Sequence, residues 1–167
     1  MLTLLALMLG FAAGEQQAAS AHSTGSGQGT FISAEEIAAT LKASIANNTV
    51  DSPIKLAEIP GGHKASMALL RRTKAETSAL IHDYVTEIYQ IVDGSGTIVT
   101  GGTLMDPKES DLTRVNAGMS HTGMHHGGES RKVKAKDVII VPAGMAHRFS
   151  ELDGPITYLV YRFEPKR

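Results

Sequence analysis

Short apolar runs fill the chain from Pro53 onward, and Gly or Pro residues separate them. Within residues 65–70, alternate side chains would point to opposite faces of an extended chain, as they do in a β-strand. Many short strands with Gly and Pro turns predict an all-β domain, either closed or built from two packed sheets. The predicted strands cover residues 54–59, 65–70, 77–82, 97–100, 138–141, 147–150 and 156–163, together with the run before Asp93 and the segment around Val133.

Residues 80–102 form the stretch around which the rest of the chain is organised. They begin with a polar cluster that contains His82 and Glu87, and they continue as a β-rich run up to the Asp-Gly-Ser-Gly sequence at 93–96. Two such runs joined by a Gly-containing turn predict a β-hairpin. This hairpin would hold the polar cluster at one end of a sheet.

One amphipathic helix is predicted over residues 33–47. Ser33 and Glu36 have the spacing of a capping box, in which each side chain bonds the other's backbone N–H. Apolar residues follow at four-residue spacing on one face: Ile37, Leu41 and Ile45. We expect this face to pack on the β domain or on a partner subunit.

The N-terminal residues resemble an export signal. Residues 1–13 are almost wholly apolar, and the first basic residue is Lys42. Residues 1–21 are predicted to be a signal peptide cleaved before His22, with a competing site at residues 12–14, so a secreted or periplasmic location is expected. The alternative is a cytoplasmic protein with an uncleaved arm. Residues 22–32 are rich in Gly and Ser and are predicted to be a flexible linker, which leaves 33–167 as the folded domain.

Charge and composition narrow the function further. Sixteen basic and seventeen acidic residues give a formal charge of -1. The protein therefore has no net positive electrostatic field that would favour binding to nucleic acid or to an anionic membrane surface. The apolar N-terminal run is too short to span a bilayer, and no membrane partner is expected once it is cleaved. The chain has no cysteine, which excludes disulfides and thiolate metal sites. Any metal must therefore use histidine, carboxylate or water.

Residues 103–129 show little periodicity and are predicted to be a long loop. The loop would lie over the mouth of the domain as a lid, and it carries His121, His125 and His126. One of these could supply a metal ligand or transfer a proton, and His125 is the candidate for a catalytic role. The alternative is a solvated loop with no chemical role.

Two motifs carry the chemistry. In the first, four residues separate His82 from Glu87, and six more precede Gly94. In the second, a buried-looking strand leads into Pro142-x-Gly144-x-x-His147. The Pro would set the end of the strand, and the Gly would let the backbone turn so that the His points inward.

Together these motifs resemble those of the cupin family, over about the last two-thirds of the chain. The chain departs from the family pattern at the first His position, where Leu80 stands, and in the second motif, where Lys136 replaces Gly and Glu151 replaces Asn. The resemblance implies a double-stranded β-helix, the cupin jelly-roll barrel. It also implies that single-domain members commonly pair, so a homodimer is expected.

The resemblance further implies a metal site made of His82, Glu87 and His147. Two imidazoles and one carboxylate leave open positions on the metal, which is typical of non-haem iron and is also used with manganese, nickel or zinc. The expected function is that of a small metalloenzyme of dioxygenase, isomerase or lyase type acting on a small organic substrate. The alternative is a cupin that has lost its metal and only binds a small ligand.

Tyr89 is the second candidate for a catalytic role. It lies two residues after Glu87, so both side chains share one face of the strand, and its hydroxyl could bond a substrate. The alternative is that Tyr89 packs in the core with its hydroxyl at the rim. Arg71 and Arg72 are expected on solvated strand faces.

Overall fold

The computed structural model describes residues 29–167. The predicted signal peptide at 1–21 and most of the predicted linker at 22–32 lie outside the described residues. Within 29–167, no helix is long and apolar enough to cross a membrane.

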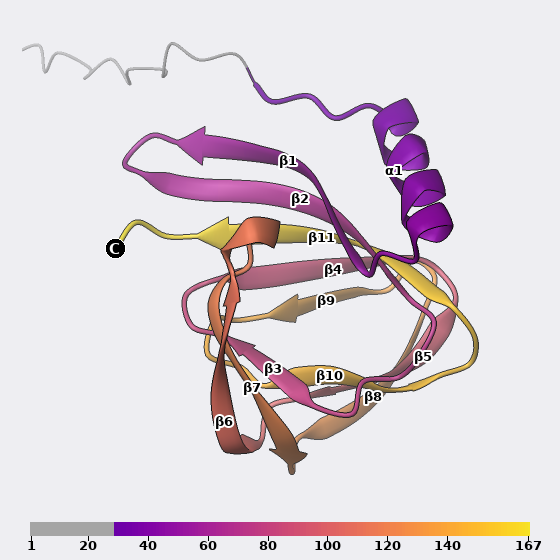
Figure 1. Ribbon diagram of the computed structural model, residues 1–167, viewed down its shortest axis with the longest axis vertical. Coiled ribbons are helices and arrows are strands. Elements are labelled where there is room, and N and C mark those ends of the chain that lie inside the picture. The colour runs from indigo at the N-terminus through magenta and orange to yellow at the C-terminus, as the bar shows by residue number, and fades with distance from the viewer. Residues whose placement is uncertain (1–28) are drawn as a thin grey trace, which may run out of the picture.

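The structure is a sandwich of two antiparallel sheets with one α-helix on its outside (Figure 1). The first sheet contains, in spatial order, β1 (Asp51–Ile59), β2 (His63–Arg72), β11 (Ile156–Glu164), β4 (Thr86–Asp93) and β9 (Val138–Val141). The second contains β6 (Thr103–Leu112), β7 (Gly118–His126), β3 (Ala79–His82), β10 (His147–Leu152), β5 (Ser95–Thr100) and β8 (Glu129–Lys134). The prediction of an all-β jelly roll with one helix is confirmed.

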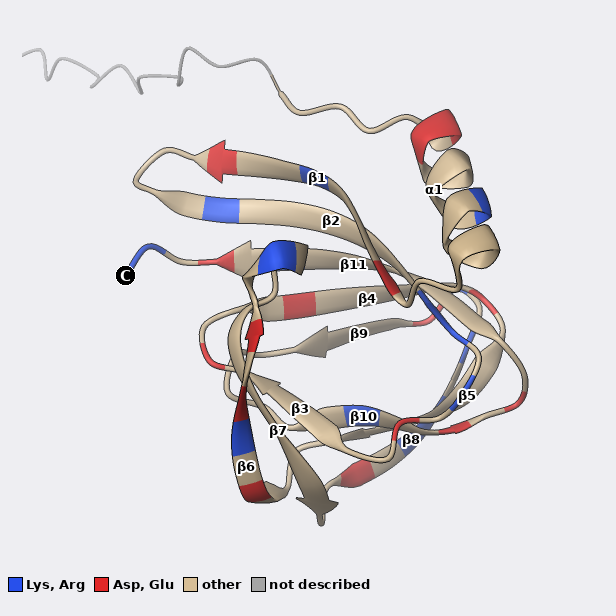
Figure 2. Ribbon diagram, viewed as in Figure 1, with Lys and Arg blue, Asp and Glu red and all other residues tan. Residues whose placement is uncertain are grey.

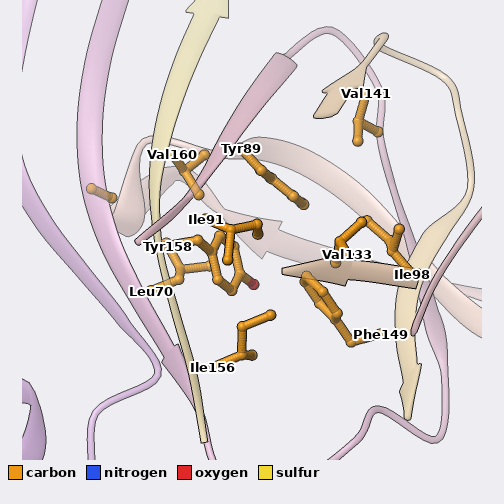
Figure 3. Packing of buried hydrophobic residues seen from close by; sticks show 11 residues of the cluster. Leu70, Tyr89, Ile91, Ile98, Val133, Val141, Phe149, Ile156, Tyr158 and Val160 are labelled. Atoms are coloured by element: carbon orange, nitrogen blue, oxygen red, sulfur yellow. The ribbon is translucent and has the colours of Figure 1, made fainter. Parts of the chain in front are cut away.

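The core lies between the two sheets and follows from the alternation along each strand. On β11, Ile156, Tyr158 and Val160 point inward, and on β4, Tyr89 and Ile91 do the same. They meet side chains from the second sheet, such as Ile98, Val133 and Phe149 (Figure 3). The alternate residues of β11 that face the core continue as far as Arg162, and those of β4 begin at Glu87. Two charged residues therefore occupy core-facing positions at one end of the sandwich.

The helix α1 (Ala34–Asn47) packs on the outer face of the first sheet. Ser33 and the side chain of Glu36 exchange the two hydrogen bonds of the predicted capping box, each 3.1 Å long. Ile37 and Leu41 cover the outward-facing Met67, Leu69 and Leu159. Of the two packing partners considered, the helix therefore uses its own β domain.

The predicted hairpin at 80–102 was wrong, although its strands exist. β4 pairs with β11 and β9 in the first sheet, whereas β5 pairs with β10 and β8 in the second. Only Gly94 separates them, and one residue is too short for the two-residue loop of a tight hairpin. Gly94 has φ +82°, and a Cβ atom there would overlap the Pro155 carbonyl oxygen and lie 2.9 Å from Cα of Ile156. The turn is a corner that carries the chain between sheets.

The predicted loop at 103–129 was also wrong. This segment contains β6 and β7, which pair with each other, and the short 3₁₀ helix η1 (Thr113–Val115) between them. The sequence of β6 lacks the alternation of apolar and polar residues that marks a strand. The reason is that β6 is a largely exposed edge strand whose register shifts between Met105 and Lys108. An exposed edge strand needs no apolar face, so its sequence resembles that of a loop.

Candidate metal centre

The three predicted ligands come together between the sheets. Glu87 projects from β4 in the first sheet, while His82 on β3 and His147 on β10 project from the second. One nitrogen or oxygen atom from each lies within 4.8 Å of the others, and all three side chains are buried. β3 and β10 are neighbours, and His147 pairs with Leu80, so the two histidines share one end of the sheet.

Hydrogen bonds at Nδ1 fix both imidazole rings. Nδ1 of His147 lies 3.0 Å from the carbonyl oxygen of Met145, which can only accept, so this nitrogen carries the hydrogen. Nδ1 of His82 lies 2.8 Å from Oγ of Ser120, whose hydroxyl is in turn within reach of the carbonyls of Ala117 and Gly118. Nε2 of each ring then faces Glu87, and in the neutral ring its lone pair has the orientation that metal-binding imidazoles adopt. When the ring of His82 is protonated, the same nitrogen donates to the carboxylate instead.

The two oxygens of Glu87 have different partners. Oε2 lies 3.2 Å from Nε2 of His82 and 3.6 Å from Nε2 of His147, and it accepts a 2.5 Å hydrogen bond from the hydroxyl of Tyr89. Oε1 accepts a 2.8 Å hydrogen bond from Nε of Arg162. The carboxylate is therefore held by both oxygens, and only Oε2 faces the histidines.

Burial and charge set the protonation of these groups. Burial by itself raises the pKa of Glu87, but the hydrogen bond and charge of His82, followed by the charge of Arg162, bring it well below its usual range. Burial lowers the pKa of His147 despite the opposing charge of Glu87. Burial, reinforced by Glu87, raises the pKa of Tyr89 well above its usual value. At neutral pH the set is thus a carboxylate, a neutral His147 and a protonated tyrosine.

Arg162 ties the centre to the surrounding structure. Its guanidinium, 3% exposed, bonds Glu87, donates to the carbonyl of Val115 in η1 at 2.5 Å and pairs with Asp51 on β1 at 2.6 Å. A buried arginine with acceptors from three other elements holds the carboxylate in one orientation. Sequence reasoning missed Arg162, although its in-phase position on an otherwise apolar strand is a signal that was present.

A cavity of about 350 Å³ opens onto the three ligands. Leu80, which stands where the cupin pattern has its first His, lines this cavity. Arg72 also lines it, with Nε 2.8 Å from the hydroxyl of Tyr158, so the expected solvated position of Arg72 was wrong. The cavity has the size of a small-molecule site.

The two predicted catalytic residues have different outcomes. Tyr89 shares the inward face with Glu87 and lines the cavity, but its hydroxyl bonds Glu87 and its ring packs in the core. His125 lies on β7, outside the residues that line the cavity, and its Nε2 is 2.7 Å from the carbonyl oxygen of Gly101. His121 pairs with Asp83 at 2.9 Å. With residues 103–129 folded as paired strands, the structure brings none of these lid histidines into the metal-ligand set.

Neither a protein-family model nor a curated protein matches this sequence. Solved structures do match. A protein from Bacillus halodurans is 14% identical with a TM-score of 0.51, over 85% of this chain and 86% of that one. A cupin superfamily protein from Desulfitobacterium hafniense is 14% identical with a TM-score of 0.42, over 70% and 77%. Hydroquinone 1,2-dioxygenase from Sphingomonas sp. TTNP3, solved with 4-hydroxybenzoate bound, is 13% identical with a TM-score of 0.43, over 61% and 60%.

Its two packed antiparallel sheets give the chain the jelly-roll fold of a cupin. Both motifs have clear positions in it. Gly94 forms the corner after β4, and the N–H of Gly144, at φ +78°, donates to the carbonyl of His82 at 2.8 Å, so the second motif is tied to the first. Lys136 stands where the cupin pattern has Gly and has φ +81°, a conformation that favours glycine. The backbone of this cupin fold thus keeps the turn although the residue has changed.

Proposed function

We propose that this cupin-fold protein is a small metalloenzyme that acts on a small organic substrate, with a divalent transition metal held by His82, Glu87 and His147. The observation that carries the proposal is the convergence of two imidazole Nε2 lone pairs on one carboxylate oxygen in a buried site. A divalent cation bound between these three atoms would accept the lone pair of each imidazole and balance the charge of the buried carboxylate. The donor set fits iron, manganese, nickel or zinc.

The reaction class is of dioxygenase, isomerase or lyase type. A metal with open positions supplies Lewis-acid or oxygen-binding chemistry when bound. Ser120 orients His82, the carbonyl of Met145 orients His147, and Arg162 orients Glu87. The hydroxyl of Tyr89 donates its hydrogen bond to Glu87. Leu80 contributes an apolar wall where the family pattern has a ligand, which leaves that side of the centre to the substrate.

Elemental mass spectrometry of the purified protein tests this proposal. We expect close to one transition metal per chain, lost in His82→Ala and in His147→Ala but kept in His126→Ala, which changes an exposed histidine on β7. Circular dichroism establishes that each variant is folded. No metal in the folded wild type, even after reconstitution with iron, manganese, nickel and zinc, would overturn the proposal.

A specific observation favours a second candidate, a metal-free module that binds a small ligand. Arg162 already pairs with Glu87 at 2.8 Å, and Leu80 removes a ligand from the family pattern. In that case the cavity would bind its ligand with the polar residues only orienting it. Ligand affinity that is unchanged by a chelator, in a protein that binds no metal, would select this candidate.

A homodimer is also part of the proposal. The outer face of the first sheet exposes a row of apolar side chains, in which Tyr161 on β11 pairs with Ile88 on β4, and Ile88 pairs with Ile140 on β9. Ile140 is 63% exposed. Light scattering coupled to size exclusion measures the mass, and a monomer at all concentrations would contradict this part.

A further inference from the structure

The walls of the cavity carry three arginines, Arg72, Arg114 and Arg162, alongside apolar residues that include Leu70, Leu112 and Val115. A cavity with apolar walls and a few charged groups recognises a ligand by its shape and by complementary charge. Which arginine is available for a ligand depends on the acceptors that each already has.

Two of the three arginines are committed to the protein. Arg162 bonds Glu87, Asp51 and the carbonyl of Val115. Arg72 pairs with Glu76 at 2.9 Å and bonds the hydroxyl of Tyr158 at 2.8 Å. Their guanidinium groups are neutralised by carboxylates, so neither presents an uncompensated charge to a ligand.

Arg114 differs from both. It is exposed, and among residues 29–167 it has no carboxylate within ion-pair distance and no side-chain hydrogen bond. It belongs to η1, the short helical turn between β6 and β7, whose basic residue is blue in Figure 2. Arg114 therefore offers its five N–H donors at the cavity.

The backbone that carries Arg114 is held in place. Thr113 bonds Asp111 through its N–H at 2.9 Å and through its hydroxyl at 2.6 Å. The next residue after Arg114, Val115, accepts the hydrogen bond from Arg162. The same buried guanidinium thus fixes both the metal ligand Glu87 and the turn that presents Arg114. A charge on a fixed turn costs less ordering when it binds a ligand.

We propose that the substrate is a small monocarboxylic acid with an apolar body, whose carboxylate is bound by Arg114. The guanidinium matches one carboxylate through two parallel hydrogen bonds, and the apolar walls accept the rest of the molecule. This inference rests on the proposed function, because it takes the cavity over the His82, Glu87 and His147 set as the substrate site.

Calorimetric titration with a matched pair of probes, hexanoate and its neutral amide hexanamide, tests the inference, with hexyl phosphate as a third probe. Each is titrated into metal-loaded and chelator-treated protein, because a carboxylate could also bind the metal directly. We expect hexanoate to bind about tenfold more tightly than hexanamide in both preparations, a modest value because Arg114 lies at the rim. The preference should shrink at high salt.

The variants decide the outcome. Arg114→Gln should remove the preference for hexanoate, while Arg131→Gln, which changes an exposed arginine on β8 outside the cavity lining, should keep it. Equal binding of acid and amide, a preference that survives Arg114→Gln, tighter binding of hexyl phosphate, or no binding of any probe would each overturn the inference. The protein could prefer hexanoate through Arg114 and yet take up no metal. That result would overturn the proposed metalloenzyme function but not the carboxylate site at Arg114. A metal-loaded protein without that preference would overturn only the carboxylate site.

Discussion

Arg162 Nε lies 2.8 Å from Glu87 Oε1, so one carboxylate oxygen is bonded to a buried guanidinium while the other faces the two histidines. The side chains of Arg162 and Glu87 are 3% and 2% exposed. Because Oε1 is bonded to Arg162, only Oε2 is left to bind a metal. Arg162 is therefore a positioning residue for the proposed centre.

Arg162→Met should destabilise the metal-free protein by about 3–5 kcal/mol, because it leaves Glu87 buried and unpaired. Chemical denaturation measures this loss. Asp51→Asn is the matched control, since it removes the other ion pair of the same guanidinium at a side chain that is 21% exposed and should cost less. If both variants lose the same stability, the Arg162–Glu87 contact contributes no more to stability than the Arg162–Asp51 ion pair does.

The Arg162 variants also have a readout at the metal. In cobalt-substituted protein, Arg162→Met frees Oε1, so we expect the visible absorption of the cobalt to change. Arg162→Lys, which restores a buried donor, should return it part of the way toward wild type. Identical cobalt spectra in all three folded proteins would show that Arg162 acts only on stability.

Ser120→Ala should weaken metal binding by about 10–100-fold, because it removes the hydrogen bond that orients His82. Competition with a chromophoric chelator gives the affinity. Ser130→Ala, at an exposed position on β8, is the control and should leave the affinity unchanged. An unchanged affinity in Ser120→Ala would mean that packing alone holds the His82 ring.

Leu80→His should tighten metal binding, because position 80 lines the cavity and lies two residues before His82 on the same face of β3. The same chelator competition measures the gain. Since a fourth protein ligand would occupy space open to the substrate, turnover or ligand binding should fall at the same time. A variant that is folded but no tighter would show that position 80 cannot reach the metal.

The sequence predicted which three side chains converge better than it predicted the residues that hold them in place. His82, Glu87 and His147 were predicted from the resemblance of their two motifs to those of cupins, and the shared face of Glu87 and Tyr89 followed from a period of two. The partners of Arg162 could not be found this way, because Asp51 and Val115 lie on other elements and only the tertiary fold brings them to β11. A strand pattern fixes which face a residue occupies but not what approaches that face.

Turns were the least predictable part. Asp93-Gly94-Ser95-Gly96 has the composition of a hairpin turn, and only the pairing of β4 and β5 with strands of different sheets makes it a corner. The edge strand β6 and its neighbour β7 were missed because β6 is largely exposed and needs no apolar alternation, and because the second half of β7 is only partly buried. Both errors arise where the local sequence does not decide which strand becomes the neighbour.

Lys136→Gly should stabilise the protein by about 1 kcal/mol, because a lysine at φ +81° adopts a conformation that glycine adopts without strain. Thermal unfolding measures the gain. The opposite change at a comparable φ, Gly144→Lys, should destabilise. A loss of stability in Lys136→Gly would mean that contacts of the lysine side chain outweigh its backbone strain.

The free energy of unfolding of the metal-free protein should fall on acidification, over a pH range that is set by Glu87 and His147. The pKa of Glu87 in the folded protein lies below its ordinary value of 4.5, so the unfolded chain binds its proton first. The contribution of Glu87 is therefore complete above about pH 4.5 and is lost as the pH falls further. The pKa of His147 lies below its ordinary 6.5, so its protonation adds a loss that begins below about pH 6.5.

Denaturant unfolding of wild type and Glu87→Gln, at a series of pH values between 7 and 3, separates these effects. The difference between the two proteins should shrink by about 2 kcal/mol or more on going from neutral to strongly acidic pH. In this difference Glu76, whose pKa burial raises and which therefore acts in the opposite direction, largely cancels, because the charge of Glu87 is only a smaller cause of its shift. If the difference stays constant with pH, Glu87 is not the charged, hydrogen-bonded carboxylate that its contacts with Arg162 and His82 require.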